Sequence, residues 1–266
     1  MNFKEKYGTW ALITGATSGI GEELAHQIAA KGLNILLVAR KEKELQEKAD
    51  ALRSKYKVET AYISADLASP GGVEAVETGA KGKDVGLLVL AAGLEVNGAF
   101  EKTDIRKELQ VVQLNVVSTM ALTHWFIEPM VKKGRGGVLL VASLSGHMPN
   151  PYFANYAGSK AYMLNFGASL YGEMKPKGVD VTVLSPGLTQ TPMSTNTGVD
   201  WTKTPMSAML PGEVAQTGLD ALGKQVLAVP GIKNKLMAGM AKHSPLGMSA
   251  RMSEGMIREA IAPEKR

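Results

Sequence analysis

Short apolar runs alternate with longer stretches of helical spacing through residues 1–184, and this alternation restricts the fold more than any other feature. Near-continuous apolar runs are typical of strands that are covered on both faces. The predicted strands are residues 10–14, 33–39, 58–64, 85–91, 137–142 and 179–184. The predicted helices are residues 20–31, 41–55, 104–132 and 155–174, with a short helix after Pro70. Because such alternation implies βαβ units, we expect an α/β fold with a parallel sheet between two layers of helices.

The chain has the size of one large domain. Its 266 residues are enough for one sizeable core, and no linker divides them. We therefore expect a single domain over residues 1–266. After Pro186 the pattern becomes irregular and rich in methionine. We expect a substrate loop at about 188–212 and a helical C-terminal tail at about 231–266.

Composition argues against several classes of protein. The absence of cysteine excludes a disulfide framework, a thiolate zinc site and a cysteine nucleophile. The histidines are scattered without metal-ligand spacing, so no metal site is expected. Neither a signal peptide nor a membrane-spanning run is recognisable, and we expect a cytoplasmic protein. The net charge is +5, but acidic residues lie among the basic ones, so we expect no nucleic-acid partner.

A glycine-rich turn follows the first predicted strand. Gly15, Gly19 and Gly21 lie between that strand and the helix at 20–31. Glycine permits a tight turn, a close approach of the backbone to phosphate, and close packing of helix on strand. The N–H groups at a helix N-terminus also favour a diphosphate. The turn therefore predicts a nucleotide-binding site.

Tyr156 and Lys160 form a candidate proton-transfer pair. They are four residues apart in a predicted helix, so their side chains share one face. Carbonyl reduction needs a proton donor for the oxygen, and a nearby lysine cation is expected to lower the pKa of a tyrosine. Ser143, at the end of a predicted strand, is expected to donate to the substrate oxygen as charge develops there.

The ordered set Thr-Gly-x-x-x-Gly-x-Gly and Tyr-x-x-x-Lys resembles the short-chain dehydrogenase/reductase family over residues 9 to about 193, and the tail resembles its hydroxysteroid-dehydrogenase-like branch. The resemblance implies a Rossmann-type doubly wound sheet, NAD(P) as cofactor and no metal. It also implies that Asn115 joins the catalytic residues Ser143, Tyr156 and Lys160 by holding a water that connects Lys160 to solvent.

The same resemblance places cofactor-binding residues after several strands. Asp66 is expected to bind adenine beside Leu67, and the turn at 186–191 to hold the nicotinamide carboxamide. Ala91 and Ala92 depart from the Asn-Asn pair of many relatives, which removes amides that could order this loop. The expected cofactor-binding residues are Gly15, Thr17, Ser18, Gly19, Ile20, Gly21, Arg40, Lys41, Asp66, Leu67, Ala92, Gly93, Asn115, Tyr156, Lys160, Pro186, Gly187, Thr189 and Thr191.

Arg40 indicates which nicotinamide cofactor is used. An acidic residue at the end of the second strand would bind the adenosine ribose and select NAD. Here Ala39 stands at that place and is followed by Arg40 and Lys41. A guanidinium group matches a phosphate dianion with two hydrogen bonds. We therefore predict NADP(H), with NAD(H) as the less favoured alternative.

The predicted function is NADP(H)-dependent interconversion of a carbonyl and an alcohol. The expected substrate walls are residues 94–100, 144–153 and the loop with Met193, Trp201, Met206 and Met209, which suit an apolar substrate. A 3-oxoacyl thioester reductase is the main alternative. A non-catalytic NADP(H)-binding sensor or scaffold is less favoured, because it would give the predicted catalytic residues Asn115, Ser143, Tyr156 and Lys160 no role.

The tail and the oligomeric state leave alternatives open. Ile232, Leu236 and Met240 have helical spacing beside Lys233 and Lys235. A basic amphipathic helix can lie on an anionic membrane, but we favour packing on the domain or at a subunit contact. The family resemblance implies a homodimer or homotetramer through the helices that contain Asn115 and Tyr156.

Overall fold

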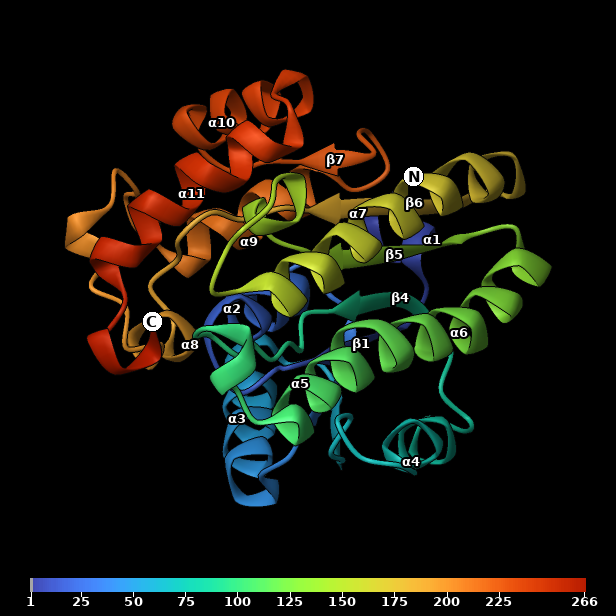
Figure 1. Cartoon of the computed structure of the whole chain (residues 1–266). Coiled ribbons are helices and arrows are strands. Elements are labelled where there is room, and N and C mark those ends of the chain that lie inside the picture. The colour runs from blue at the N-terminus through green and yellow to red at the C-terminus, as the bar shows by residue number, and fades with distance from the viewer. Residues whose placement is uncertain (1) are drawn as a thin grey trace.

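The computed structural model describes residues 2–266, which build a seven-stranded sheet in the order β3-β2-β1-β4-β5-β6-β7 (Figure 1). All neighbouring strands are parallel. The strands are β1 Trp10–Thr14, β2 Asn34–Ala39, β3 Thr60–Ser64, β4 Val85–Leu90, β5 Gly136–Val141, β6 Val179–Leu184 and β7 Leu227–Ala228. The chain order reverses between β1 and β4, so ligands are expected beyond the carboxyl ends of these strands. The predicted doubly wound, Rossmann-type sheet is confirmed.

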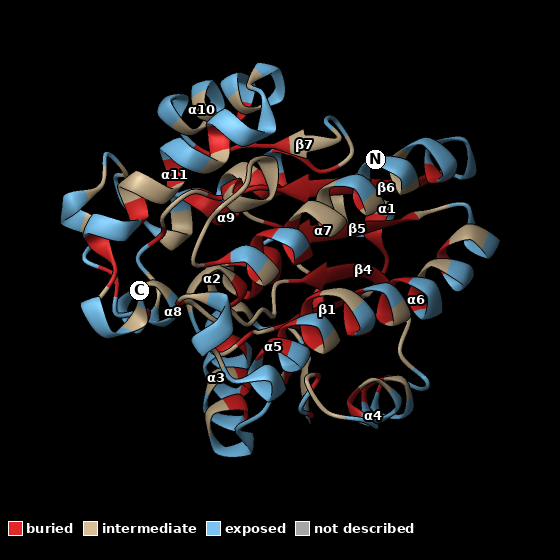
Figure 2. Ribbon diagram, in the orientation of Figure 1, coloured by how far each residue is buried: buried red, intermediate tan, exposed pale blue. Residues whose placement is uncertain are grey.

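Helices cover both faces of the sheet because alternate strand residues point to opposite sides. On β1, Ile13 belongs to one buried cluster and Leu12 to the other. The first cluster includes side chains of α2 Gly19–Ala29, α3 Glu42–Tyr56 and α9 Pro211–Ala221. The second includes side chains of α4 Gly72–Gly79, α6 Thr119–Lys133 and α7 Ala154–Met174. Figure 2 shows buried strands between helices whose outer faces are exposed.

The long helix predicted at 104–132 is interrupted. Helix α5 covers Ile105–Val112, a π-helical segment covers Gln113–Ser118, and α6 follows. Asp104 caps α5 by accepting a hydrogen bond from the backbone N–H of Arg106. The extra residue of a π-helical turn changes the direction of the side chains that follow it, and such turns often occur at functional sites.

Several short elements were not predicted from the sequence. They are α1 Phe3–Tyr7, α8 Pro192–Thr195 and β7, and the longer α9 was also missed. Strand β7 contains only two residues, and α1 only five, so neither has room for a recognisable apolar period. The remaining short helical turns are Phe100–Lys102, Leu144–His147, Lys175–Lys177, Trp201–Lys203 and Pro263–Lys265.

The predicted helical tail consists of two helices, α10 Ile232–His243 and α11 Leu246–Ala260. Their buried residues include Ala238, which packs with Leu144 and Val229, and Ile257, which packs with Phe153 and Tyr156. The predicted stripe does not make this contact, because Ile232 is 79% exposed and Leu236 is 63% exposed. Among residues 2–266, no helix is long and apolar enough to cross a membrane.

Candidate active site

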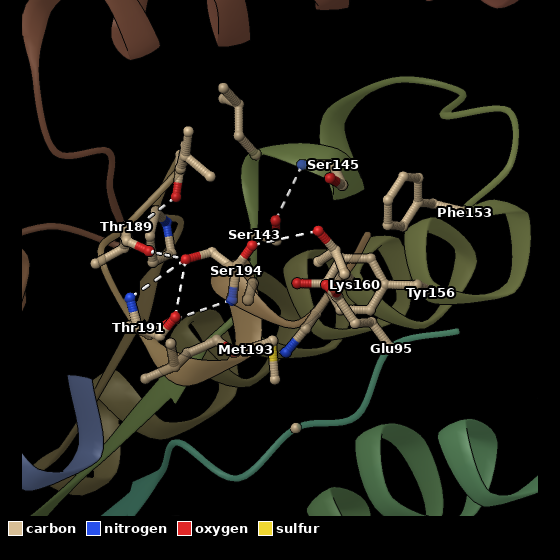
Figure 3. Close-up of a pocket in the computed structure, with 18 of the residues that line it drawn as sticks. Glu95, Ser143, Ser145, Phe153, Tyr156, Lys160, Thr189, Thr191, Met193 and Ser194 are labelled. Atoms are coloured by element: carbon tan, nitrogen blue, oxygen red, sulfur yellow. Dashed lines mark hydrogen bonds between the residues drawn. The ribbon is translucent and has the colours of Figure 1, made fainter. Parts of the chain in front are cut away.

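A cavity of about 270 Å³ lies beyond the carboxyl ends of β1, β4, β5 and β6 (Figure 3). Residues of the loops after these strands line it, together with residues of α7 and the tail helices. The predicted site residues in its lining are Gly15, Ser18, Gly19, Ile20, Gly21, Ala92, Gly93, Ser143, Tyr156, Lys160, Pro186, Gly187, Thr189 and Thr191. The structure thus brings the glycine turn and the proton-transfer pair to one cavity.

The glycine turn is shaped by close backbone packing. Gly15 has φ +66°, and a Cβ atom there would lie 2.8 Å from the backbone of Ala92. A Cβ atom on Gly21 would overlap the carbonyl oxygen of Gly15. At the N-terminus of α2, the side chain of Ser18 makes no capping hydrogen bond with the first N–H groups of the helix. This cradle fits the pyrophosphate of a dinucleotide.

Thr14 holds the loop after β4 beside this turn. Its hydroxyl oxygen accepts hydrogen bonds of 3.1 Å from the backbone N–H groups of both Ala91 and Ala92. This contact orders a loop that lacks the Asn-Asn pair of many relatives. Thr14 was not predicted as a site residue, although its position at the end of a predicted strand, just before the glycine turn, indicates such a role.

Asn115 lies in the π-helical segment and is fully buried. Its side-chain oxygen accepts from the N–H of Leu94, and its amide donates to the carbonyl oxygen of Leu94 and to the hydroxyl of Ser159, all at 2.9–3.0 Å. Asn115 therefore ties the loop after β4 to helix α7. The water that Asn115 is predicted to hold stays a prediction.

Tyr156 and Lys160 share one face of α7 as predicted. The Nζ atom of Lys160 lies 5.7 Å from the centroid of the Tyr156 ring and donates a 2.9 Å hydrogen bond to the carbonyl oxygen of Val141. Both side chains are buried, at 8% and 4% exposure. Figure 3 shows them at the cavity with Ser143.

Burial shifts both pKa values away from their ordinary ranges. It lowers the pKa of Lys160 to about 8, against the opposing charge of Glu95. It raises the pKa of Tyr156, and Glu95 adds to this increase while the Ser143 hydroxyl opposes it. The net shift of the Tyr156 pKa is upward, because desolvation of the phenolate and the charge of Glu95 outweigh the hydrogen bond with Ser143. The expected lowering of this pKa by Lys160 stays a prediction.

Ser143 follows β5 and turns into the cavity. Its hydroxyl oxygen accepts a 3.2 Å hydrogen bond from the N–H of Ser145, which fixes the side chain at the start of the turn Leu144–His147. The N–H of Leu144 in turn bonds the carbonyl oxygen of Pro186 at 2.7 Å. The loops after β5 and β6 are thereby joined at the cavity.

The turn after β6 is ordered by a side chain that the sequence analysis did not select. The Ser194 hydroxyl donates to the carbonyl oxygen of Thr189 at 2.7 Å, and the N–H of Ser194 donates to the Thr191 hydroxyl oxygen at 3.4 Å. The second of these bonds and the bond from the Thr191 N–H to the Ser194 hydroxyl oxygen cap helix α8. Thr191 thus has one local partner, and its hydroxyl hydrogen can still be donated into the cavity.

The remaining predicted residues lie outside the cavity lining. Arg40 and Asp66 are exposed at the same sheet edge, where the Ser64 hydroxyl donates to the Arg40 carbonyl oxygen. Lys41 pairs with Glu44 at 2.6 Å. The Asp66 carboxylate accepts a hydrogen bond from the N–H of Ala68. Thr17 and Leu67 are likewise not part of the lining.

The substrate walls combine predicted and unpredicted residues. The lining includes the predicted loop residues Met193, Trp201 and Met206, whereas Met209 packs against the main core. The tail contributes further side chains that were not predicted, namely Met237, Ser253, Met256 and Ile257. Glu95 was also missed as an individual residue, although it lies in the predicted wall at 94–100.

Comparison with known proteins agrees with this geometry. The family model for short chain dehydrogenases matches residues 9–200. A 7beta-hydroxysteroid dehydrogenase of Collinsella aerofaciens is 34% identical over 238 residues, which cover 88% of this chain and 90% of the relative. A very-long-chain 3-oxoacyl-CoA reductase of Meyerozyma guilliermondii is 36% identical over 200 residues, covering 71% and 59% of the two chains.

Solved structures that are similar to this chain are also dehydrogenases. A 7beta-hydroxysteroid dehydrogenase studied for stereoselectivity has a TM-score of 0.87 and 30% identity, covering 95% of this chain and 99% of the other. A short-chain dehydrogenase from Sphingobium yanoikuyae in complex with NADPH has a TM-score of 0.80 and 26% identity, covering 88% and 94%. The chain described here belongs to the short-chain dehydrogenase family.

Proposed function

We propose that this protein interconverts a carbonyl and an alcohol with NADP(H), and that Ser143, Tyr156 and Lys160 carry the reaction. The observation that carries this proposal is that these side chains line the same cavity as the glycine turn. The bound nicotinamide supplies or accepts the hydride. The protein has to bind and orient the substrate and move one proton.

In the direction of reduction, Tyr156 donates its hydroxyl proton to the carbonyl oxygen of the substrate. Its raised pKa keeps the hydroxyl protonated near neutrality but makes the proton harder to release, so proton transfer depends on groups that stabilise the phenolate. Ser143 donates a hydrogen bond to the same oxygen as negative charge develops. Lys160 provides positive charge beside the phenolate that remains. Asn115 holds the loop after β4 against helix α7 through its bonds to Leu94 and Ser159.

NADP(H) is the proposed cofactor because Arg40 stands where a 2′-phosphate would be recognised. The exposed guanidinium group follows β2 directly and lies at the same sheet edge as the glycine turn. A related structure was determined with NADPH. Replacement Arg40→Asp should reverse the preference between NADPH and NADH, measured as the ratio of the two kcat/KM values. An unchanged ratio would exclude this role.

The proposed substrate has an apolar body. Methionine and aromatic side chains form much of the cavity wall, including Phe153, Met193 and Trp201. The 7beta-hydroxysteroid dehydrogenase relatives favour a steroid-like ketone or alcohol. The 3-oxoacyl-CoA reductase relatives keep a 3-oxoacyl thioester as the second candidate.

A panel assay tests the proposed function. NADPH consumption is measured with keto-steroids, simple apolar ketones and 3-oxoacyl thioesters. Tyr156→Phe should abolish turnover and leave NADPH binding nearly intact. Tyr162→Phe is the matched control, because Tyr162 lies on the same helix, stacks on Phe166 and does not line the cavity. Substantial turnover by Tyr156→Phe would contradict the mechanism.

A homodimer or homotetramer is the proposed assembly. Apolar side chains are exposed along α5 and α6, including Ile105, Leu109 and Trp125. Burial of such a face between subunits would remove apolar surface from water. Light scattering with size-exclusion chromatography would measure the mass, and a purely monomeric protein would exclude this assembly. A cytoplasmic location remains a prediction.

A further inference from the structure

Glu95 is a partly buried glutamate that lines the active-site cavity and that the mechanism does not use. Its Oε1 atom is shielded from solvent and has no hydrogen-bond partner among residues 2–266. Glu95 lines the same cavity as Tyr156 and Lys160, and Figure 3 shows it beside them. A buried polar atom without a partner destabilises the fold, so its presence in a cavity calls for an explanation.

The backbone on both sides of Glu95 is firmly held. Both the N–H and the carbonyl oxygen of Leu94 bond the side chain of Asn115. Two residues after Glu95, the amide of Asn97 donates to the carbonyl oxygen of Thr197 at 3.0 Å, and its oxygen accepts from the Nζ of Lys265 at 2.7 Å. The carboxyl group is therefore presented to the cavity from a fixed segment rather than from a mobile loop.

The charges around Glu95 restrict what it can bind. Burial raises the pKa of Glu95 to about 7, and the positive charges of Lys160 and Lys265 oppose this increase. Glu95 in turn raises the pKa of Tyr156. A carboxyl oxygen needs a hydrogen-bond donor, whereas a substrate ammonium group at this place would meet the positive charge of Lys160. An uncharged donor fits both conditions.

We propose that Glu95 accepts a hydrogen bond from a hydroxyl group of the substrate that lies close to the reacting carbonyl. The protein then prefers hydroxy ketones, and the corresponding diols, over ketones that lack the hydroxyl. The apolar wall with Phe153 and Met193 holds the rest of the substrate. A site built to bind a hydroxyl group rejects the analogue without it, because the buried carboxyl is then left unpaired. This inference rests on the proposed carbonyl chemistry.

The experiment compares pairs of apolar ketones that differ only in one hydroxyl group on the carbon next to the carbonyl. For the wild-type protein with NADPH, we expect kcat/KM to be roughly tenfold to a hundredfold higher for the hydroxy ketone. Glu95→Leu replaces the acceptor with an apolar side chain of similar size. This variant should bring the ratio close to one. Glu95→Gln, which keeps a neutral acceptor, should restore part of it.

A surface variant serves as the control. Glu101 is an exposed glutamate outside the cavity, and Glu101→Gln should keep the wild-type ratio. Thermal unfolding and NADPH binding establish that each variant is folded. A wild-type ratio near one, or a wild-type ratio that persists in Glu95→Leu, would overturn the role of Glu95 while leaving the oxidoreductase function standing. If the wild type reduced no ketone of any pair, the proposed function itself would fall, and this inference with it.

Discussion

The partly buried carboxyl of Glu95 makes the stability of this protein depend on pH in a way that one substitution can isolate. Its pKa is raised from 4.5 to about 7 by burial. In the unfolded chain Glu95 loses its proton at lower pH than in the folded protein. The folded state thus binds more protons, and the free energy of unfolding falls as the pH rises from about 4.5 to about 7.

The size of this effect follows from the same two pKa values. One pKa unit corresponds to about 1.4 kcal/mol, so ionising Glu95 should destabilise the folded protein by about 3 kcal/mol above pH 7. Glu95→Gln has no proton to lose. Relative to this variant, the wild type should therefore lose about 3 kcal/mol of unfolding free energy between pH 4 and pH 8.

Urea unfolding at a fixed protein concentration measures this difference. Both proteins are unfolded at a series of pH values, and the free energies are extrapolated to water. Glu101→Gln controls for the loss of one surface carboxyl and should follow the wild type. If the wild type and Glu95→Gln change in parallel across this pH range, Glu95 is not a desolvated carboxyl, and the electrostatic argument is refuted.

Three further predictions concern the cofactor site and the loops around it. Gly21→Ala should destabilise the fold by about 1–3 kcal/mol and weaken NADPH binding, because the added Cβ would overlap a backbone oxygen of the glycine turn. Calorimetry measures the loss of stability, and fluorescence titration measures the loss of NADPH affinity. The affinity for NADPH should fall as the pH rises through about 8, where Lys160 loses its charge, and this fall should be absent in Lys160→Met. Lys265→Ala removes bonds to the side chain of Asn97 and the carbonyl oxygen of Thr197, so hydrogen exchange should become faster in both segments; unchanged exchange would show that the tail does not hold them.

The sheet and the central site were predictable because they depend on local patterns. Apolar runs such as those at 10–14 and 85–91 are typical of strands covered on both sides. The glycine turn and the Tyr156–Lys160 spacing are also local, and the parallel topology then brings the strand ends together. In the structure Tyr156, Ser143 and the glycine turn line one cavity.

The features that were missed depend on contacts between distant parts of the chain. The interruption of the helix at 104–132 accompanies the bonds from Asn115 to Leu94 and Ser159, which the helical period cannot reveal. The upward shift of the Tyr156 pKa was not predicted because its main cause, the depth of burial, cannot be seen in the sequence. Glu95 was not predicted as a site residue because nothing in its immediate sequence shows that its carboxyl oxygen is shielded from solvent.

The tail shows a limit of the apolar period. Its stripe with Ile232 and Leu236 was expected to pack on the domain or at a subunit contact. Both side chains are exposed, so the stripe does not pack on the domain, and the subunit contact stays a prediction. The small residue Ala238 is buried instead. Helix α11 also places Met256 in the cavity wall. The period of apolar residues alone cannot tell which face of a surface helix meets the domain.

Isotope transfer tests the central claim most directly. The protein is mixed with a ketone that it turns over and with NADPH that carries deuterium at the transferable position of the nicotinamide ring, and the alcohol product is examined by mass spectrometry and NMR. We predict one deuterium on the carbinol carbon of the wild-type product, and no product above background with Tyr156→Phe. An alcohol without deuterium at that carbon, or equal product from Tyr156→Phe, would contradict hydride transfer from NADPH with Tyr156 as the proton donor.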